Sequence, residues 1–138
     1  MVCVHCGQKT AVINSRSRLR TNQVWRRRIC LVCHAVFSTL EAADYGAVWL
    51  VKGLDGHLQP FTSDKLFLSL YQSCQHRPTA LTDARALTDT VIKKLFTQVK
   101  DGVIPTKTIM TTAQIALVRF DKAASVHYQA FHQQTPKF

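Results

Sequence analysis

Four cysteines are the residues of this chain whose type and spacing most clearly indicate chemistry. They form two Cys-x-x-Cys pairs, Cys3 with Cys6 and Cys30 with Cys33, and residues 7–29 separate the pairs. Two such pairs brought face to face supply the four soft sulfur ligands of a tetrahedral Zn²⁺ site. The spacing therefore predicts one Zn²⁺ per chain, held in a small zinc ribbon. Because four cysteines leave no open position for water or substrate, we expect this zinc to be structural.

Positive charge is concentrated around these cysteines. Residues 1–40 contain no Asp or Glu and seven basic residues, namely Lys9, Arg16, Arg18, Arg20, Arg26, Arg27 and Arg28. Four thiolates and one Zn²⁺ together contribute a formal charge of about −2, so this segment remains strongly positive. Such a field attracts polyanions, which makes the six arginines candidate nucleic-acid contacts rather than a merely solvated face. The residues by themselves leave DNA and RNA both open.

The composition argues against several other classes of protein. No apolar run approaches the 18 or so residues of a membrane span, and the first residues contain no apolar leader segment. Paired Cys-x-x-Cys motifs without such a leader favour metal binding in a reducing compartment, so we expect a cytoplasmic protein. The sequence has no nucleophile–base pair, no paired carboxylates and no open metal site, which argues against an enzyme. Cys74, among apolar neighbours, is expected to be a buried core residue.

The elements that must hold the cysteines are short strands and tight turns. We predict strands at 11–13, 24–26 and 36–40, around two turns that each contain a cysteine pair. Gly7 and His34 follow the second cysteine of each pair, where a positive φ is expected. Trp25 is predicted to pack against these turns.

The remainder of the chain predicts a mostly helical domain. A joint at 44–46 precedes a strand at 48–51, a hairpin turn at 54–57 and a strand at 58–61. Helices are expected to begin at Thr62 or Ser63, at Thr82, at Thr106 and at Asp121, with the last running to about His132. Residues 133–138 are expected to fray. The predicted fold class is α+β, with a zinc ribbon at 1–46 and a helical domain of one β-hairpin and four helices at 47–134.

The ordered succession of these motifs resembles the NrdR-type bacterial repressors of ribonucleotide reductase genes. The motifs that carry the resemblance are Cys3-x-x-Cys6, Asn14-Ser15-Arg16, Arg26-Arg27-Arg28-x-Cys30-x-x-Cys33, Phe37-Ser38-Thr39-Leu40-Glu41, Asp55-Gly56, Pro60-Phe61 with Lys65, Arg77-Pro78 and Asp121-Lys122-Ala123-Ala124. They extend over nearly the whole chain. Proteins of this family join a zinc ribbon to an ATP-cone, a small nucleotide-sensing domain.

The resemblance implies a zinc-dependent repressor that binds double-stranded operator DNA in the cytoplasm, at the nucleoid. It implies that ATP or dATP binds the cone as an effector and controls assembly of a homo-oligomer. Lys52 and Lys65 would bind the phosphates, and Gln59 would bond the base or ribose. Without the resemblance, both lysines would be read as solvated surface residues.

Two departures from the family pattern keep a second interpretation open. The family has a basic pair before its Asp-Gly turn, where this chain has Gly53 and Leu54, and it has an acidic residue where this chain has Gln59. The alternative is a zinc-ribbon adaptor that binds nucleic acid and whose helical domain binds a protein and no nucleotide.

Overall fold

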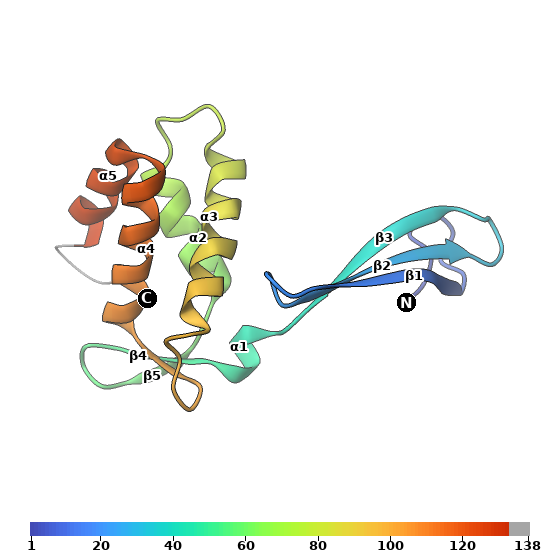
Figure 1. Cartoon of the computed structure of the whole chain (residues 1–138), viewed down its shortest axis with the longest axis horizontal. Coiled ribbons are helices and arrows are strands. Elements are labelled where there is room, and N and C mark those ends of the chain that lie inside the picture. The colour runs from blue at the N-terminus through green and yellow to red at the C-terminus, as the bar shows by residue number, and fades with distance from the viewer. Residues whose placement is uncertain (133–138) are drawn as a thin grey trace. The chain divides into compact units, whose positions relative to one another are not determined.

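The computed structural model describes residues 1–132, and the chain divides into two compact units, Met1–Ala43 and Asp44–Phe138 (Figure 1). The first unit is a β-sheet and the second is mostly helical, so the predicted α+β class is confirmed. The fraying predicted for 133–138, and the end of the domain predicted at residue 134, lie outside the described residues. Within residues 1–132, no helix combines the length and hydrophobicity needed to span a membrane.

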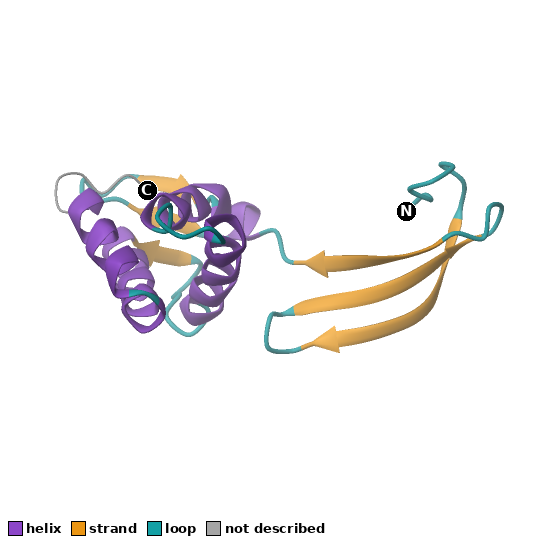
Figure 2. Ribbon diagram, turned by 90° about the horizontal axis from the view of Figure 1, so that it is seen from above, coloured by secondary structure: helices purple, strands orange, loops and turns teal. Residues whose placement is uncertain are grey.

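Three long antiparallel strands form the first unit, in the order β1-β2-β3 (Figure 2). They are β1 (Thr10–Arg18), β2 (Gln23–Cys30) and β3 (Val36–Ala42), all longer than the strands predicted from sequence. A register shift between Val12 and Asn14 places Ile13 as an extra residue in β1. Only Cys3 and Cys30 are buried in this unit. The sheet therefore has no hydrophobic core of its own.

The second unit begins with a short helix and a small sheet. These are α1 (Tyr45–Val48), β4 (Leu50–Lys52), β5 (Leu58–Pro60) and β6 (Val103–Pro105). The turn predicted between β4 and β5 is confirmed, because the Gly53 N–H donates to the His57 carbonyl at 2.9 Å and Gly56 has a φ of +84°. The strand predicted at 48–51 is wrong at its start, since Val48 ends α1.

Four further helices form the body of the unit: α2 (Ser63–Ser73), α3 (Ala80–Leu95), α4 (Thr106–Phe120) and α5 (Lys122–His132). Each helix contacts two others, so that α2, α3, α4 and α5 close into a ring. The interior is filled by apolar residues at helical spacing, including Leu66, Leu70, Val91, Leu95, Ile109, Leu117 and the predicted Cys74. This is the only extensive hydrophobic core among residues 1–132.

The observed helix starts agree only in part with the starts predicted from the sequence. Asp121 precedes α5 as predicted, and its carboxylate accepts the Ala124 N–H at 2.9 Å. The second predicted start is two residues late, because α3 begins at Ala80. α4 begins at Thr106 as predicted, but its N-cap is Pro105, and the Thr106 hydroxyl donates to the Lys52 carbonyl at 3.1 Å. This bond joins α4 to β4.

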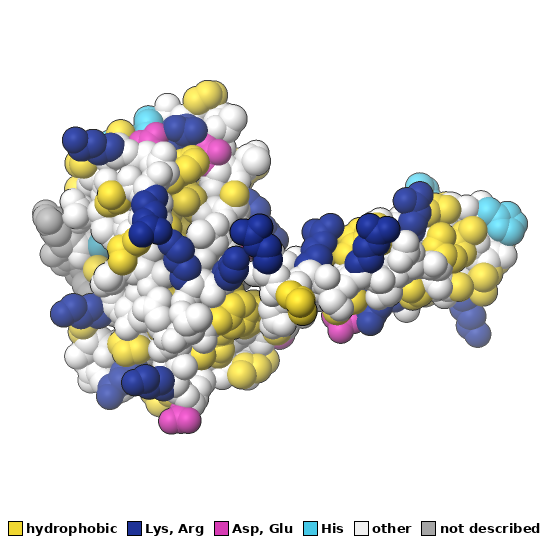
Figure 3. Space-filling model, in the orientation of Figure 1, with side chains coloured by type: hydrophobic (Ala, Val, Ile, Leu, Met, Phe, Trp, Pro, Cys, Tyr) yellow, Lys and Arg dark blue, Asp and Glu magenta, His cyan; other side chains and the backbone are white. Residues whose placement is uncertain are grey.

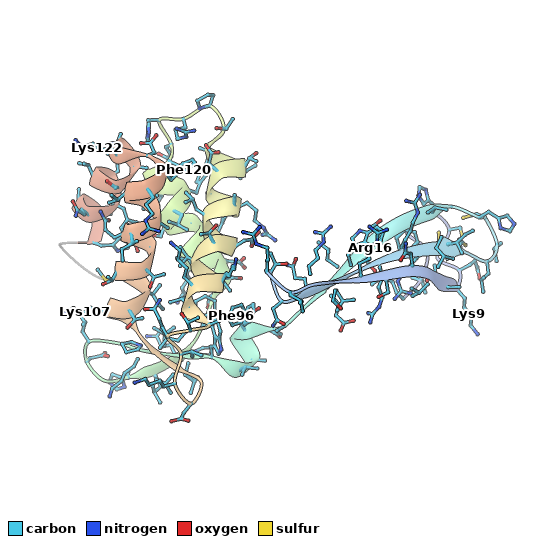
Figure 4. The ribbon with its side chains drawn as sticks, viewed as in Figure 1. Lys9, Arg16, Phe96, Lys107, Phe120 and Lys122 are labelled. Atoms are coloured by element: carbon cyan, nitrogen blue, oxygen red, sulfur yellow. The ribbon has the colours of Figure 1, made fainter. Side chains whose placement is uncertain are left out.

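An ionic cluster joins the α2–α3 connection to the junction of α4 and α5. The Arg77 guanidinium donates to Asp83 and to Asp121, each at 2.8 Å, and lies 4.7 Å from the centre of the Phe120 ring. Figure 4 shows Phe120 at this junction. The cluster fixes one end of the helical ring.

Candidate metal centre and nucleic-acid interface

The four cysteines predicted as ligands converge at one end of the sheet. Their sulfur atoms all lie within 4.8 Å of one another. Cys3 Sγ lies 3.7 Å from Cys33 Sγ, and Cys6 Sγ lies 3.4 Å from Cys30 Sγ. A tetrahedral Zn²⁺ with bonds of about 2.3 Å would place sulfur atoms about 3.8 Å apart. The cluster therefore fits one Zn²⁺ with all four positions filled by protein.

Backbone N–H groups favour the thiolate form of Cys30, the form that a metal requires. The His5 N–H donates to Cys3 Sγ at 3.3 Å, and the N–H groups of Val32 and Cys33 donate to Cys30 Sγ at 3.4 Å. The Cys33 N–H, opposed by desolvation and assisted by Val32, lowers the pKa of the Cys30 thiol to about 6. Four thiolates this close repel one another, and a divalent cation removes that repulsion.

The two turns around the cysteines share one conformation. Gly7 and His34, each directly after the second cysteine of a pair, have φ values of +73° and +58°. The prediction of a positive φ at both positions is confirmed. His34 is therefore a turn residue at the ligand cluster, beside sulfur ligands that already complete a tetrahedron.

The six candidate arginines do not form one surface. Pairing of β1 with β2 places Arg16 opposite Trp25 and Arg18 opposite Gln23. Because side chains alternate along a strand and directly paired residues share a face, Arg16, Arg18 and Arg27 lie on one face. Arg26 and Arg28 lie on the other face of the sheet, and Arg20 lies in the β1–β2 turn. We call the first set the open arginine face.

The two faces differ in what the arginines contact. Arg26 forms an ion pair with Glu41, and Arg28 donates to Thr39 and to Thr10 at 3.4 Å. Glu41 is the only acidic residue of Met1–Ala43. In the described part of the chain, the exposed side chains of the open arginine face have neither a hydrogen bond nor an ion pair. Those three guanidinium groups are free for a ligand.

Apolar side chains lie between the arginines, as Figure 3 shows for one side of the sheet. Arg16 projects from the sheet in Figure 4. Trp25 is half-buried on the open arginine face, five residues along β2 from Cys30. At about 3.4 Å per residue this is a separation of about 17 Å. The prediction that Trp25 packs against the cysteine turns is therefore wrong.

The three residues predicted to bind nucleotide lie near one end of the helical unit. Gln59 is paired with Val51 in the small sheet, while Lys52 alternates to the other face of β4. Lys65, in the first turn of α2, lines a small hollow together with Val51 and Ile109. The hollow beside Lys65 is therefore lined by Val51, the strand partner of Gln59, but by neither Gln59 nor Lys52.

A larger cavity that the sequence did not indicate lies between α4 and α5. It has a volume of about 330 Å³, and its lining includes Met110, Gln114, Tyr128 and His132. Gln114 Oε1 is buried and has no hydrogen-bond partner among residues 1–132. Burial, offset in part by Ser69, raises the pKa of the Tyr128 hydroxyl, which therefore stays neutral. No sequence signal marks this cavity, because its lining residues come from two helices and match no motif.

One link connects this cavity to Lys65. The Ser69 hydroxyl lies 2.8 Å from His132 Nε2, and Ser69 is one helical turn after Lys65 in α2. One turn advances about 5.4 Å along the axis. Lys65 itself lines the small hollow and not this cavity.

The chain is similar to known transcriptional repressors. Residues 1–41 match the family described as "Transcriptional repressor NrdR-like, N-terminal domain". The Transcriptional repressor NrdR of Symbiobacterium thermophilum is 30% identical over 134 residues, which cover 97% of this chain and 88% of that protein. The corresponding repressor of Anaplasma phagocytophilum is 32% identical over 129 residues, which cover 93% of this chain and 83% of the relative.

A third relative, the Transcriptional repressor NrdR of Heliobacterium modesticaldum, is 30% identical over 135 residues, which cover 97% of this chain and 88% of that protein. All three are repressors, which is a non-enzymatic role, as the absence of catalytic motifs in the sequence predicts. The geometry of the cysteine cluster fits the zinc ribbon expected of this family, and the similarity extends over nearly the whole chain. The chain belongs to the NrdR family of transcriptional repressors.

Proposed function

We propose that this protein represses ribonucleotide reductase genes by binding operator DNA through its zinc ribbon, and that ATP or dATP in the helical unit controls its assembly. It would act as a homo-oligomer in the cytoplasm, at the nucleoid. The observation that carries the proposal is the open arginine face, which is exposed, uncompensated by acids and held on a sheet that depends on the cysteine cluster.

The open arginine face suits duplex DNA for two reasons. A β-sheet edge or ribbon is narrow enough to enter the major groove, and Arg is the side chain that most often reads guanine there. Because Arg16, Arg18 and Arg27 have no partner in the described protein, they lose no ion pair when they bind phosphate or base. Each neutralised phosphate releases counterions, so binding should weaken steeply as salt rises.

The DNA proposal is tested with zinc-loaded protein and a labelled duplex from upstream of a ribonucleotide reductase gene, beside a scrambled duplex. We expect preference for the upstream duplex and loss of binding in the triple variant Arg16→Ala, Arg18→Ala, Arg27→Ala. The charge-matched control is Arg85→Ala, Lys93→Ala, Arg119→Ala, which removes three exposed cations from the helical unit. Equal losses in the two triple variants would refute a specific role for the ribbon face.

The nucleotide proposal rests on Lys65 and the cavity. Thr62 stands at the N-cap of α2 without a side-chain capping bond, so N–H groups of the first turn remain available beside the Lys65 ammonium. Both would attract phosphate oxygens. In the cavity, the unpartnered Gln114 Oε1 is an acceptor that the exocyclic amino group of adenine could satisfy. Lys52 and Gln59 are the further candidate contacts in the small sheet.

Calorimetry with ATP, dATP and ADP tests this site. Lys65→Ala should weaken triphosphate binding by about 1.5–3 kcal/mol, the worth of a charge-assisted hydrogen bond. It should also remove any nucleotide-dependent change in oligomer size seen by size-exclusion chromatography. Lys93→Ala, an exposed cation of α3, is the control. If the wild-type protein gives no heat and no size change with any nucleotide, the adaptor interpretation replaces this one, and a protein partner for the helical unit should be sought.

A further inference from the structure

The β1–β2 turn, residues 18–22, carries a solvated leucine between two arginines. Leu19 is 91% exposed, and Arg18 and Arg20 on either side of it are exposed as well. The turn lies at the opposite end of β1 from the cysteine cluster. Burying the Leu19 side chain would remove a large apolar surface from water, yet nothing in Met1–Ala43 covers it. An apolar tip flanked by cations suits a partner with a negative exterior and an apolar interior.

The turn is held in a defined shape. The Thr21 N–H donates to the Arg18 carbonyl at 3.2 Å, and the Thr21 hydroxyl lies 3.1 Å from Gln23 Oε1. Asn22 completes the turn with a φ of +50°, a conformation that Asn tolerates better than most residues. Leu19 is thus presented on a fixed hairpin, so little entropy is lost when it enters a partner.

The distance from this turn to Arg27 is close to half a turn of B-DNA. Arg27 is paired with Asn14, and Leu19 lies five residues further along the chain, about 17 Å away at the usual rise of a strand. Half a turn of B-DNA, the offset between a major groove and the next minor groove on the same side, is also about 17 Å. A ribbon that places Arg27 at the major groove therefore places Leu19, with the neighbouring Arg18 and Arg20, at the adjacent minor groove.

We propose that the β1–β2 turn inserts into the minor groove, where Arg18 and Arg20 contact the groove walls and Leu19 acts as a wedge that opens a base step. Arginines are drawn to the negative potential of a narrow minor groove, and apolar side chains between base pairs kink the duplex toward the major groove. This inference rests on the proposed DNA-binding function. It adds that the protein bends its operator and reads its deformability at a pyrimidine–purine step.

The experiment compares wild-type protein with Leu19→Ala on a short upstream duplex that carries a donor and an acceptor dye at its ends. Wild-type protein should raise energy transfer, because bending brings the ends together. Leu19→Ala should lose most of that rise and bind about five- to tenfold more weakly, with an unchanged salt dependence, because only apolar contact is lost. The matched control is Leu54→Ala, which removes a leucine that is 76% exposed in the turn between β4 and β5.

Two further arms make the result decisive. The double variant Arg18→Ala, Arg20→Ala should reduce the slope of log K against log salt by about 1.8, the value expected when two contacts to phosphates are lost. Distamycin, which fills the minor groove, should compete with wild-type protein and much less with a triple variant that combines Leu19→Ala with Arg18→Ala and Arg20→Ala. Equal bending by wild type and Leu19→Ala, or an equal loss in Leu54→Ala, overturns the wedge. Failure of the wild-type protein to bind any duplex overturns the DNA-binding function itself, so the two failures are distinguishable.

Discussion

Arg26 and Arg27 are neighbours in the sequence, but their side chains lie on opposite faces of the sheet. Arg26 is ion-paired with Glu41, whereas Arg27 is exposed and has no partner among the described residues. A surface ion pair of this kind contributes little to stability, but it offsets the charge that Arg26 presents to a polyanion. The three consecutive arginines therefore fall into two groups, distinguished only because alternate residues of a strand lie on opposite faces of the sheet.

This difference yields a matched pair of variants. Arg27→Ala should reduce the slope of log K for DNA against log salt by about 0.9, as expected for one lost phosphate contact. Arg26→Ala should leave the slope nearly unchanged. Both slopes can be measured by fluorescence anisotropy over a salt series with zinc-loaded protein. A larger slope change for Arg26→Ala than for Arg27→Ala would place the DNA on the other face.

Asp121 makes the helical unit sensitive to acid. The Ala124 N–H, followed by the Arg77 guanidinium, lowers the pKa of Asp121 from 3.8 to about 2. Because the folded-state pKa lies below that of the unfolded chain, the carboxylate stabilises the fold above about pH 4 and loses this effect as the pH falls toward 2. The contribution is therefore absent under strongly acid conditions and complete at neutral pH.

Asp121→Asn tests this linkage. The melting temperature of the wild-type helical unit, followed by circular dichroism at 222 nm, should exceed that of the variant at neutral pH. The difference should shrink as the pH falls from about 4 to about 2. Asp89→Asn, at an exposed position of α3, should show no such convergence. A difference that stays constant over this range would mean that the Asp121 carboxylate is not the titrating group.

At the scale of elements, the sheet and the helices are stabilised by different means. Cys3 and Cys30 are the only buried residues of Met1–Ala43, while the helical ring encloses an extensive apolar core. A sheet of this size without a core cannot offset the entropy cost of ordering its chain. The cysteine cluster must therefore supply the stability of β1, β2 and β3 through its metal.

Chelation of zinc under reducing conditions should unfold the sheet and spare the helices. Hydrogen exchange followed by mass spectrometry should show loss of protection in β1–β3, with α2–α5 still protected. Cys74→Ala is the control, since Cys74 belongs to the helical core and should leave the zinc content at one ion per chain. Protected β1–β3 strands in metal-free protein would contradict the dependence on zinc.

At the scale of the whole molecule, charge and apolar core are segregated into separate units. Met1–Ala43 holds seven basic residues and one acid, and residues 44–138 hold eleven basic residues and seven acids. The first unit provides the positive field, and the second provides the core and the cavity. A change that abolishes DNA binding should therefore leave nucleotide binding intact, and a change that abolishes nucleotide binding should leave DNA binding intact.

Metal removal should abolish DNA binding and leave nucleotide binding intact. Calorimetry of chelated protein should give an ATP or dATP affinity within about twofold of that of zinc-loaded protein, because the nucleotide contacts lie in the zinc-independent core. Lys65→Ala protein should conversely keep its full zinc content. Loss of nucleotide binding on chelation would show that the two units are energetically coupled.

Much of this protein is determined by its sequence alone. The cysteine spacing defines the metal ligands, because a zinc site needs only four sulfur atoms and turns that can bring them together. The positive φ values at Gly7 and His34, the turn at Asp55-Gly56 and the cap at Asp121 are also local, since neighbouring residues decide them. Helical periodicity likewise identifies the apolar positions of α2 to α5.

Tertiary structure alone decided the rest. The pairing of β4 with β6 joins residues about 50 positions apart, and a three-residue strand ending in Pro105 has no periodicity to reveal it. The faces of the arginines depend on strand register, which one extra residue at Ile13 shifts. The cavity at Gln114 and Tyr128 exists only where α4 meets α5. Local patterns report local interactions, whereas pairing, register and cavities arise from contacts between segments distant in the chain.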